Sequence, residues 1–254
     1  MIPIALQLYT VRADLAQDPV RIIKAVAEIG YQGVEGGTPA GMSNQDYLSL
    51  LADNNLILIG SGTSTADLQD NLPGVVERCS ELGINTLMCG IGGELRQSDG
   101  DWKRVVAGLA EGCAKASEAG LRILYHNHAF EFEDKVDGQY GLDYLFDTIP
   151  ETDIQAELDT YWVQVGGEDP VAYINKYAGR LPRLHIKDRA PAPADEECPL
   201  AEVGPGIFDW EGSFAAALGA DVEGYGVVQE RCARSPLESA RESRASQPLS
   251  TENH

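Results

Sequence analysis

Short apolar runs alternate with longer helical patterns eight times along the 254 residues of this chain, and this alternation constrains the fold most strongly. Runs rich in β-branched residues predict strands, and segments with an apolar period near 3.6 predict helices. The predicted strands cover 4–9, 33–36, 56–60, 86–89, 122–126, 154–159, 183–187 and 226–229. The predicted helices cover 19–29, 45–54, 67–82, 101–119, 140–147, 170–178, 210–218 and 236–244. Eight such units favour a closed α/β barrel, the (β/α)8 TIM barrel, because an open sheet usually needs fewer strands.

Capping signals support these helix boundaries. Asp18 and Asp169 each precede a proline at a predicted helix start, where an aspartate cap followed by proline is favoured. Gly30, Gly83 and Gly120 each stand between a predicted helix and the next strand, as glycine caps do. No linker divides the chain, so we expect a single domain over 1–245 and a frayed tail over 246–254.

Composition narrows the function classes. The chain has 19 basic and 40 acidic residues, a net charge of −21, and 43% hydrophobic residues. This apolar content excludes extensive disorder, and the negative charge argues against nucleic acid and anionic membranes as partners. No apolar run has the roughly 18 residues of a membrane span, and the N-terminus lacks the features of a secretory signal. We therefore expect a cytoplasmic protein.

The five cysteines are scattered and contain no Cys-x-x-Cys pair. An odd, scattered set predicts neither a disulfide framework nor a structural zinc cluster.

Polar side chains gather at the ends of three consecutive predicted strands. The pairs, each two positions apart, are His126 with His128, Glu157 with Asp159, and His185 with Lys187. Because side chains alternate along a strand, each pair shares one face, and a barrel brings strand ends together at its mouth. Imidazole and carboxylate together suit a borderline divalent ion. The alternative is that these groups only satisfy one another through hydrogen bonds.

Six motifs in order resemble one known family. They are LQLYTVR at 6–12, YHNHAFEF at 125–132, ELD at 157–159, HIKD at 185–188, EVGPGIFDW at 202–210 and PLES at 236–239. The series resembles the xylose isomerase-like barrels, specifically the sugar phosphate isomerase/epimerase group. The resemblance covers almost the whole chain.

This resemblance implies a divalent ion held by side chains of the last four strands, usually Glu, Asp, His and Glu. Asp159 and His185 match the middle two positions. His126 stands where the epimerases have the first glutamate, so Glu131 is the candidate carboxylate on that side.

The eighth strand also departs from the family pattern. Val228 stands at the usual glutamate position, and valine cannot bind an ion. Glu230, two residues on and on the same strand face, is the replacement candidate. The expected metal set is therefore Glu131, Asp159, His185 and Glu230, with Mn²⁺, Zn²⁺, Co²⁺, Fe²⁺ or Mg²⁺ as the ion.

The family implies a sugar isomerase or epimerase that moves a proton next to a carbonyl. His126 and His128 are the candidate bases, since imidazole titrates near neutral pH. Lys187 is expected to hold developing negative charge or a substrate hydroxyl, or else to pair with Asp188 or Glu157.

Three further side chains are candidates for substrate binding. Tyr9 and Trp162 could form an apolar wall against a sugar ring, although such aromatics are often plain core. Glu35 could bind substrate hydroxyls or face a neighbouring arginine.

Other functions remain open. The same site suits a lyase that carries out β-elimination on a keto-sugar or keto-glycoside. The His-Asn-His motif resembles that of lyases that act on keto-glycosides. Val228 also suits a sugar-binding barrel whose catalysis has decayed. The expected partner is an unphosphorylated carbohydrate, and a homodimer is compatible with the sequence.

Overall fold

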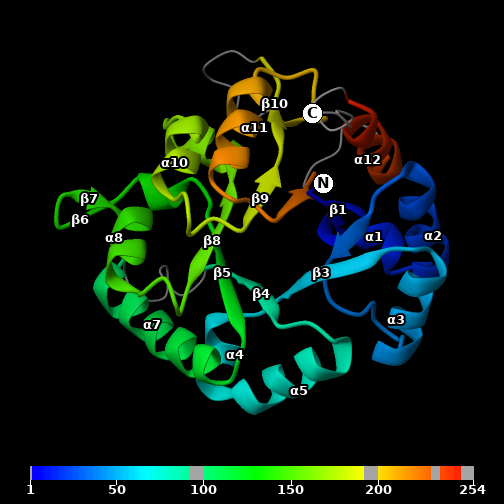
Figure 1. Ribbon diagram of the computed structural model, residues 1–254, viewed down its shortest axis with the longest axis horizontal. Helices are drawn as coiled ribbons and strands as arrows, with labels where there is room; N and C mark the ends of the chain where they lie inside the picture. The colour runs from blue at the N-terminus through cyan, green and yellow to red at the C-terminus, as the bar shows by residue number, and fades with distance from the viewer. Residues whose placement is uncertain (1, 92–99, 192–199, 230–234, 247–254) are drawn as a thin grey trace.

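The protein folds into a closed barrel of eight parallel strands surrounded by helices (Figure 1). The computed structural model describes residues 2–91, 100–191, 200–229 and 235–246. Around the barrel the strand order is β1-β12-β9-β8-β5-β4-β3-β2. The barrel strands are β1 Ile4–Gln7, β2 Gly33–Glu35, β3 Ile57–Gly62, β4 Thr86–Cys89, β5 Arg122–His126, β8 Gln155–Asp159, β9 Arg183–Ile186 and β12 Gly224–Val227. The predicted (β/α)8 architecture is confirmed.

The helices form the outer layer of the barrel. They are α1 Arg12–Leu15, α2 Pro19–Ile29, α3 Asn44–Asp53, α4 Thr65–Asp70, α5 Leu72–Leu82, α7 Trp102–Glu118, α8 Gly141–Thr148, α9 Thr160–Val165, α10 Pro170–Lys176, α11 Trp210–Gly219 and α12 Pro236–Ala245. Asp18 and Asp169 cap α2 and α10 as predicted, each accepting a backbone N–H of the first turn. The apolar faces of the helices and the outer faces of the strands pack together in one continuous core.

Several predicted boundaries differ from the structure, among them the last strand, predicted over 226–229 and observed as Gly224–Val227. Two differences have a clear local cause. The strand predicted over 4–9 ends at Gln7, because its side chain accepts the backbone N–H of Tyr9 and starts a 3-10 helix, η1 Leu8–Val11. The helix predicted over 67–82 divides into α4 and α5, since Pro73 lies in the first turn of α5, where a missing N–H is tolerated.

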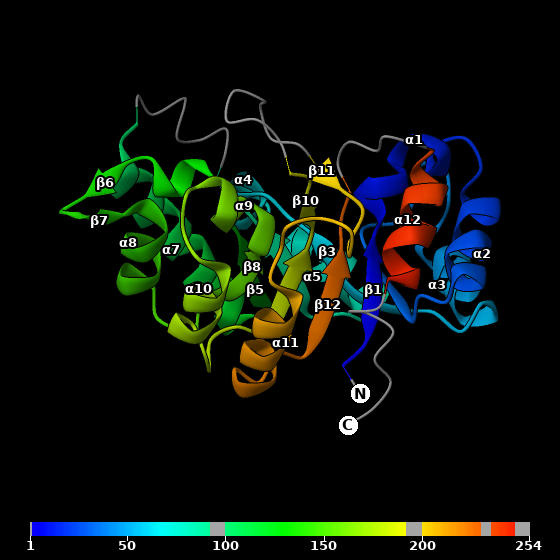
Figure 2. The same ribbon diagram turned by 90° about the horizontal axis from the view of Figure 1, so that it is seen from above.

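Short elements beyond the eight units lie mainly at one end of the barrel. They include α9, the 3-10 helix η2 Phe130–Phe132, the hairpin of β6 Lys135–Val136 and β7 Gln139–Tyr140, and the ribbon of β10 Asp188–Arg189 and β11 Leu200–Ala201. Figure 2 shows α1, α9 and the β10–β11 ribbon at the end where the strands finish, opposite the N-terminus. This end is the mouth of the barrel.

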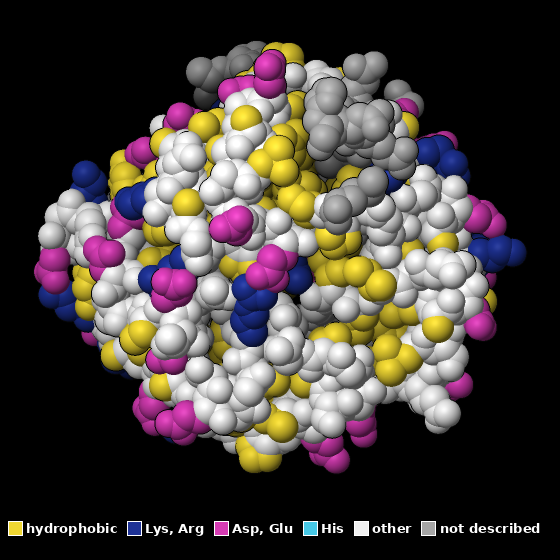
Figure 3. Space-filling model, viewed as in Figure 1, with side chains coloured by type: hydrophobic (Ala, Val, Ile, Leu, Met, Phe, Trp, Pro, Cys, Tyr) yellow, Lys and Arg dark blue, Asp and Glu magenta, His cyan; other side chains and the backbone are white. Residues whose placement is uncertain are grey.

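The opposite end is the face seen in Figure 3, where basic and acidic side chains lie close together near the middle. At this end Arg122, the first residue of β5, forms a bidentate ion pair with Glu223, with N–O distances of 2.7 and 2.8 Å.

None of the helices in the described ranges combines the length and the apolar composition needed to cross a membrane. Three buried cysteines, Cys79, Cys89 and Cys113, form no disulfide among the described residues, and Cys198 and Cys232 lie outside them.

Candidate functional site

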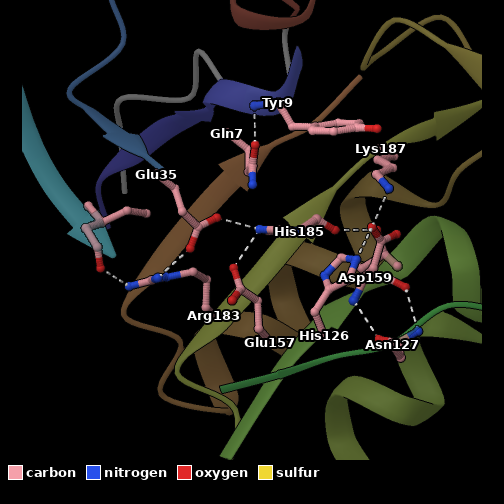
Figure 4. A network of polar contacts seen from close by, with 12 residues as sticks. Gln7, Tyr9, Glu35, His126, Asn127, Glu157, Asp159, Arg183, His185 and Lys187 are labelled. Carbon is pink, nitrogen blue, oxygen red and sulfur yellow. Dashed lines mark hydrogen bonds and ion pairs between the residues drawn. The ribbon is translucent and has the colours of Figure 1, made fainter. Parts of the chain in front are cut away.

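Three neighbouring strands place polar side chains together inside the mouth. In register, His126 of β5 lies beside Glu157 of β8, and Asp159 of β8 lies beside His185 of β9. One ligating atom each from His126, Asp159 and His185 lies within 4.8 Å of the others, and all three residues are buried (Figure 4). The structure therefore brings these three predicted residues into one group.

Asp159 is held from several sides. Its Oδ1 accepts the backbone N–H of Trp162 at 3.1 Å and so caps α9, and its Oδ2 lies 2.8 Å from Nζ of Lys187. Its own backbone N–H donates to Oδ1 of Asn127 at 2.8 Å. Asn127, the middle residue of the His-Asn-His motif, is thus a positioning residue that we did not predict.

Lys187 has no exposed surface, and its ammonium forms an ion pair with Asp159, a partner that the sequence did not predict. Asp188 instead accepts backbone N–H groups from Gly204 and Gly206 and the indole N–H of Trp210. It thereby fixes residues 204–210, which lead into α11.

A buried ionic layer lies directly beneath this group. Nε2 of His185 lies 2.6 Å from both Oε2 of Glu35 and Oε1 of Glu157. Nη1 of Arg183 lies 2.8 Å from Oε1 of Glu35, and Nη2 donates to the backbone oxygen of Ile59 at 2.7 Å. Glu35, considered for substrate hydroxyls, is thus fully buried and faces an arginine and a histidine. Arg183 and Glu157 were absent from the predicted site residues.

These contacts decide the charges of the layer. Burial alone would lower the pKa of His185, but the Glu157 and Glu35 carboxylates outweigh it and raise the pKa to about 10. Burial would raise the pKa of Glu35, but His185 and Arg183 outweigh it and lower the pKa to about 2. Burial and the repulsion from Glu35 raise the pKa of Glu157 to about 6.

Two strand glycines make room for this layer. A Cβ on Gly226 of β12 would lie 2.8 Å from Cδ2 of His185, and one on Gly60 of β3 would lie 2.8 Å from Nη1 of Arg183. Any larger residue would therefore push the imidazole or the guanidinium out of position.

The upper part of the mouth is formed by two imidazoles and an indole. The rings of His126 and His128 have centroids 5.0 Å apart, and those of His128 and Trp162 are 5.6 Å apart. Nζ of Lys187 lies 5.2 Å from the centre of the Trp162 ring. Burial lowers the pKa of His126, and the nearby His185, Lys187 and His128 lower it further, so this imidazole is neutral.

Glu131 does not belong to the His126–Asp159–His185 group. Its Oε1 accepts the hydroxyl of Tyr125 at 2.9 Å, and its Oε2 accepts the backbone N–H of His128 at 2.8 Å. The 3-10 turn of η2 carries Glu131 into this position, which a strand-based prediction missed. Burial raises the pKa of Glu131 to about 7.

The remaining candidates lie elsewhere. Tyr9 is 52% exposed on η1, with the guanidinium of Arg12 3.9 Å from the centre of its ring. Val228 follows β12 and, two residues after Gly226, shares its inward face. Glu230 lies outside the described residues.

The three-residue group fits a divalent ion. It offers two imidazoles and one carboxylate, a mixed donor set typical of open catalytic sites. Nε2 of His126 lies 3.8 Å from Oδ2 of Asp159, and Nδ1 of His185 is buried and has no hydrogen-bond partner among the described residues. The raised pKa of His185 applies without an ion, and a metal at Nδ1 would replace the proton there. The two carboxylates at Nε2 of His185 are the outer-shell partners that a metal-bound imidazole usually has.

Comparison with known proteins defines the class of this barrel. Residues 23–248 match the family model of the xylose isomerase-like TIM barrel, and the chain belongs to this family.

The individual relatives within and beyond this family are named for different activities. An inosose dehydratase of Lacticaseibacillus casei is 31% identical over 100 residues, which are 39% of this chain and 33% of that protein. The match thus spans about a third of this curated relative's length. A sugar phosphate isomerase/epimerase from Parabacteroides distasonis ATCC 8503 superposes with a TM-score of 0.79 at 22% identity, over 99% of this chain and 95% of that one. An IOLI protein with a bound zinc atom gives a TM-score of 0.71 at 15% identity, over 96% and 95%. At these identities the two structures show the shared fold.

Proposed function

We propose that this protein is a lyase that removes water from a polyhydroxylated ketone, such as a keto-sugar or a keto-cyclitol. The observation that carries the proposal is the pair of groups beside the Trp162 ring. The His128 ring lies 5.6 Å from it and the Lys187 ammonium 5.2 Å from it. An indole face suits the C–H face of a polyol ring, and a base and a cation on its border can act on neighbouring carbons.

The chemistry requires one base, one group that stabilises negative charge, and one proton for the leaving group. His128 would take the proton from the carbon next to the carbonyl, while the Lys187 ammonium stabilises the negative charge that develops on the carbonyl oxygen. The electron pair of the broken C–H bond forms the carbon–carbon double bond as the β-hydroxyl leaves. The proton on His128 passes to that hydroxyl, so the products are water and an unsaturated ketone.

A divalent ion would be held by His126, Asp159 and His185. When bound, such an ion supplies Lewis-acid polarisation of a carbonyl or hydroxyl oxygen. The zinc atom in the IOLI protein and the donor set of this chain support this assignment.

The residue at the end of β12 favours elimination over epimerisation. Inversion at a carbon needs a second proton donor on the opposite face, and the epimerases use two glutamates for this purpose. Here the residue directly after β12 is Val228, which is buried, so among the described residues the β12 end offers no carboxylate. Elimination needs a base on one face only. The name of the Lacticaseibacillus casei relative agrees with this choice.

Isomerisation is the second candidate. The His126 and His128 rings lie 5.0 Å apart on one face of the mouth, so a proton taken by one imidazole could return on the same side. A sugar isomerase would use the same residues without expelling a hydroxyl.

Incubation of the protein with an inosose in D2O separates these functions. We expect an ultraviolet absorbance from the unsaturated ketone and a product mass lower by one water. His128→Gln should lower the rate by about 10²–10⁴-fold while the melting temperature stays close to that of the parent. With a keto-sugar as substrate, deuterated aldose without new absorbance would instead establish the isomerase. Neither signal with inososes or keto-sugars would contradict both functions and leave a sugar-binding barrel.

A further inference from the structure

The ion pair between Asp159 and Lys187 lies inside the group that fits a divalent ion. We infer that the Lys187 ammonium and the divalent ion compete for Oδ2 of Asp159, so that Lys187 sets how tightly the mouth binds its metal. This inference rests on the proposed metal site at His126, Asp159 and His185.

The oxygens of Asp159 leave little choice of position. Oδ1 accepts the Trp162 N–H at 3.1 Å and caps α9, while Oδ2 lies 2.8 Å from Nζ of Lys187. The Asp159 and Lys187 side chains have no exposed surface, so water contributes little to either charge. Oδ2 is also the oxygen that faces His126, 3.8 Å from its Nε2. An ion held between His126 and Asp159 would therefore bind Oδ2, the oxygen next to the ammonium.

The nearby Glu35 is paired elsewhere, since Nη1 of Arg183 lies 2.8 Å from its Oε1. Asp159 is the single carboxylate of the His126–Asp159–His185 group, and Lys187 balances its charge. The one carboxylate available to an incoming ion is thus already in contact with a cation.

Two cations on one buried oxygen repel each other strongly, because screening by solvent is weak there. Either the ammonium keeps Oδ2 and the ion binds weakly, or the ion takes Oδ2 and the ammonium turns toward the substrate. A purely structural ion pair would behave differently: loss of Lys187 would destabilise the protein equally with and without the ion.

The test compares the parent, Lys187→Met and Lys24→Met after treatment with a chelator. Lys24 is the control, since it is an exposed lysine 4.0 Å from Glu28. Isothermal titration with Mn²⁺ and Zn²⁺ should show at least tenfold tighter binding for Lys187→Met and no change for Lys24→Met. The melting temperature of Lys187→Met should be lower than that of the parent without the ion, and saturating ion should restore it.

Equal or weaker binding by Lys187→Met would overturn the role of Lys187 while leaving the metal site intact. If neither the parent nor Lys187→Met binds an ion, the metal site fails and the inference fails with it. If Lys187→Met does not fold, the parent itself provides the test through ¹³C-labelled lysine side chains and NMR. Saturating Zn²⁺ should then shift the Lys187 ε-carbon resonance, assigned with Lys187→Arg, and an unshifted resonance would overturn the inference.

Discussion

The burial of the ionic layer leads to a quantitative prediction for Arg183→Met. Arg183 is 8% exposed and bonds Oε1 of Glu35 at 2.8 Å and the Ile59 carbonyl at 2.7 Å. Removal of the guanidinium leaves a fully buried carboxylate whose remaining cationic partner, among the described residues, is His185. Breaking a buried pair in this way costs about 3–5 kcal/mol. In a protein of this size that corresponds to a fall in melting temperature of about 6–20 °C.

Arg122→Met is the matched control. Arg122 makes two bonds of 2.7 and 2.8 Å to Glu223, but the two side chains are 32% and 58% exposed. An exposed pair contributes about 0.2–1 kcal/mol, so the melting temperature should fall by no more than about 4 °C. Differential scanning calorimetry measures both shifts. Similar shifts in the two variants would refute the reasoning that burial, rather than bond geometry, decides the cost.

Three other predictions follow from single residues. Burial raises the pKa of Glu131 to about 7, above the ordinary 4.5, so its contribution to stability is present below pH 4.5 and is lost as pH rises to about 7. Urea unfolding of Glu131→Gln should therefore show a weaker loss of stability over this range than the parent, and an identical slope would contradict the assignment. Gly226→Ala places a Cβ 2.8 Å from the His185 ring and should destabilise the protein by about 1–3 kcal/mol in thermal unfolding. Gly219→Ala is the control, because Gly219 has open space around it and its substitution should leave the stability unchanged. Val228→Glu adds a carboxylate to the inward face of the β12 end and should tighten Mn²⁺ binding at least tenfold in a titration; unchanged affinity would show that this position does not reach the ion.

The alternation of strands and helices along the chain could be predicted because it depends on features that are local in sequence. Aspartate caps and proline in the first helical turn set the starts of α2 and α10, and Gly30 in the left-handed conformation ends α2. The end of β1 could not be predicted, because it depends on the side chain of Gln7 accepting a backbone N–H rather than on an apolar pattern. Similarly, the short helix α9 starts where Asp159, predicted only as a strand-end residue, caps it.

The site was predictable where alternation along a strand decides which side chains face inward. His126, Asp159 and His185 meet for this reason. Glu131 follows the strand on a 3-10 turn, where alternation no longer applies, and it turns to Tyr125 instead. The partner of Glu35 could not be predicted, because Arg183 lies 148 positions away in the chain.

The Glu35 and Glu157 carboxylates of the ionic layer also fix the orientation of the His185 ring. Because two carboxylates lie 2.6 Å from Nε2 of His185, rotating the ring by half a turn would break both contacts inside the barrel. The ring is therefore locked, and Nδ1 is the nitrogen left for an ion or a substrate. Gly226 is required for the same reason, since a Cβ there would occupy the space of the imidazole. Residues with no direct contact to the substrate, Arg183 and Gly226 among them, thus determine which atom of His185 is available for chemistry.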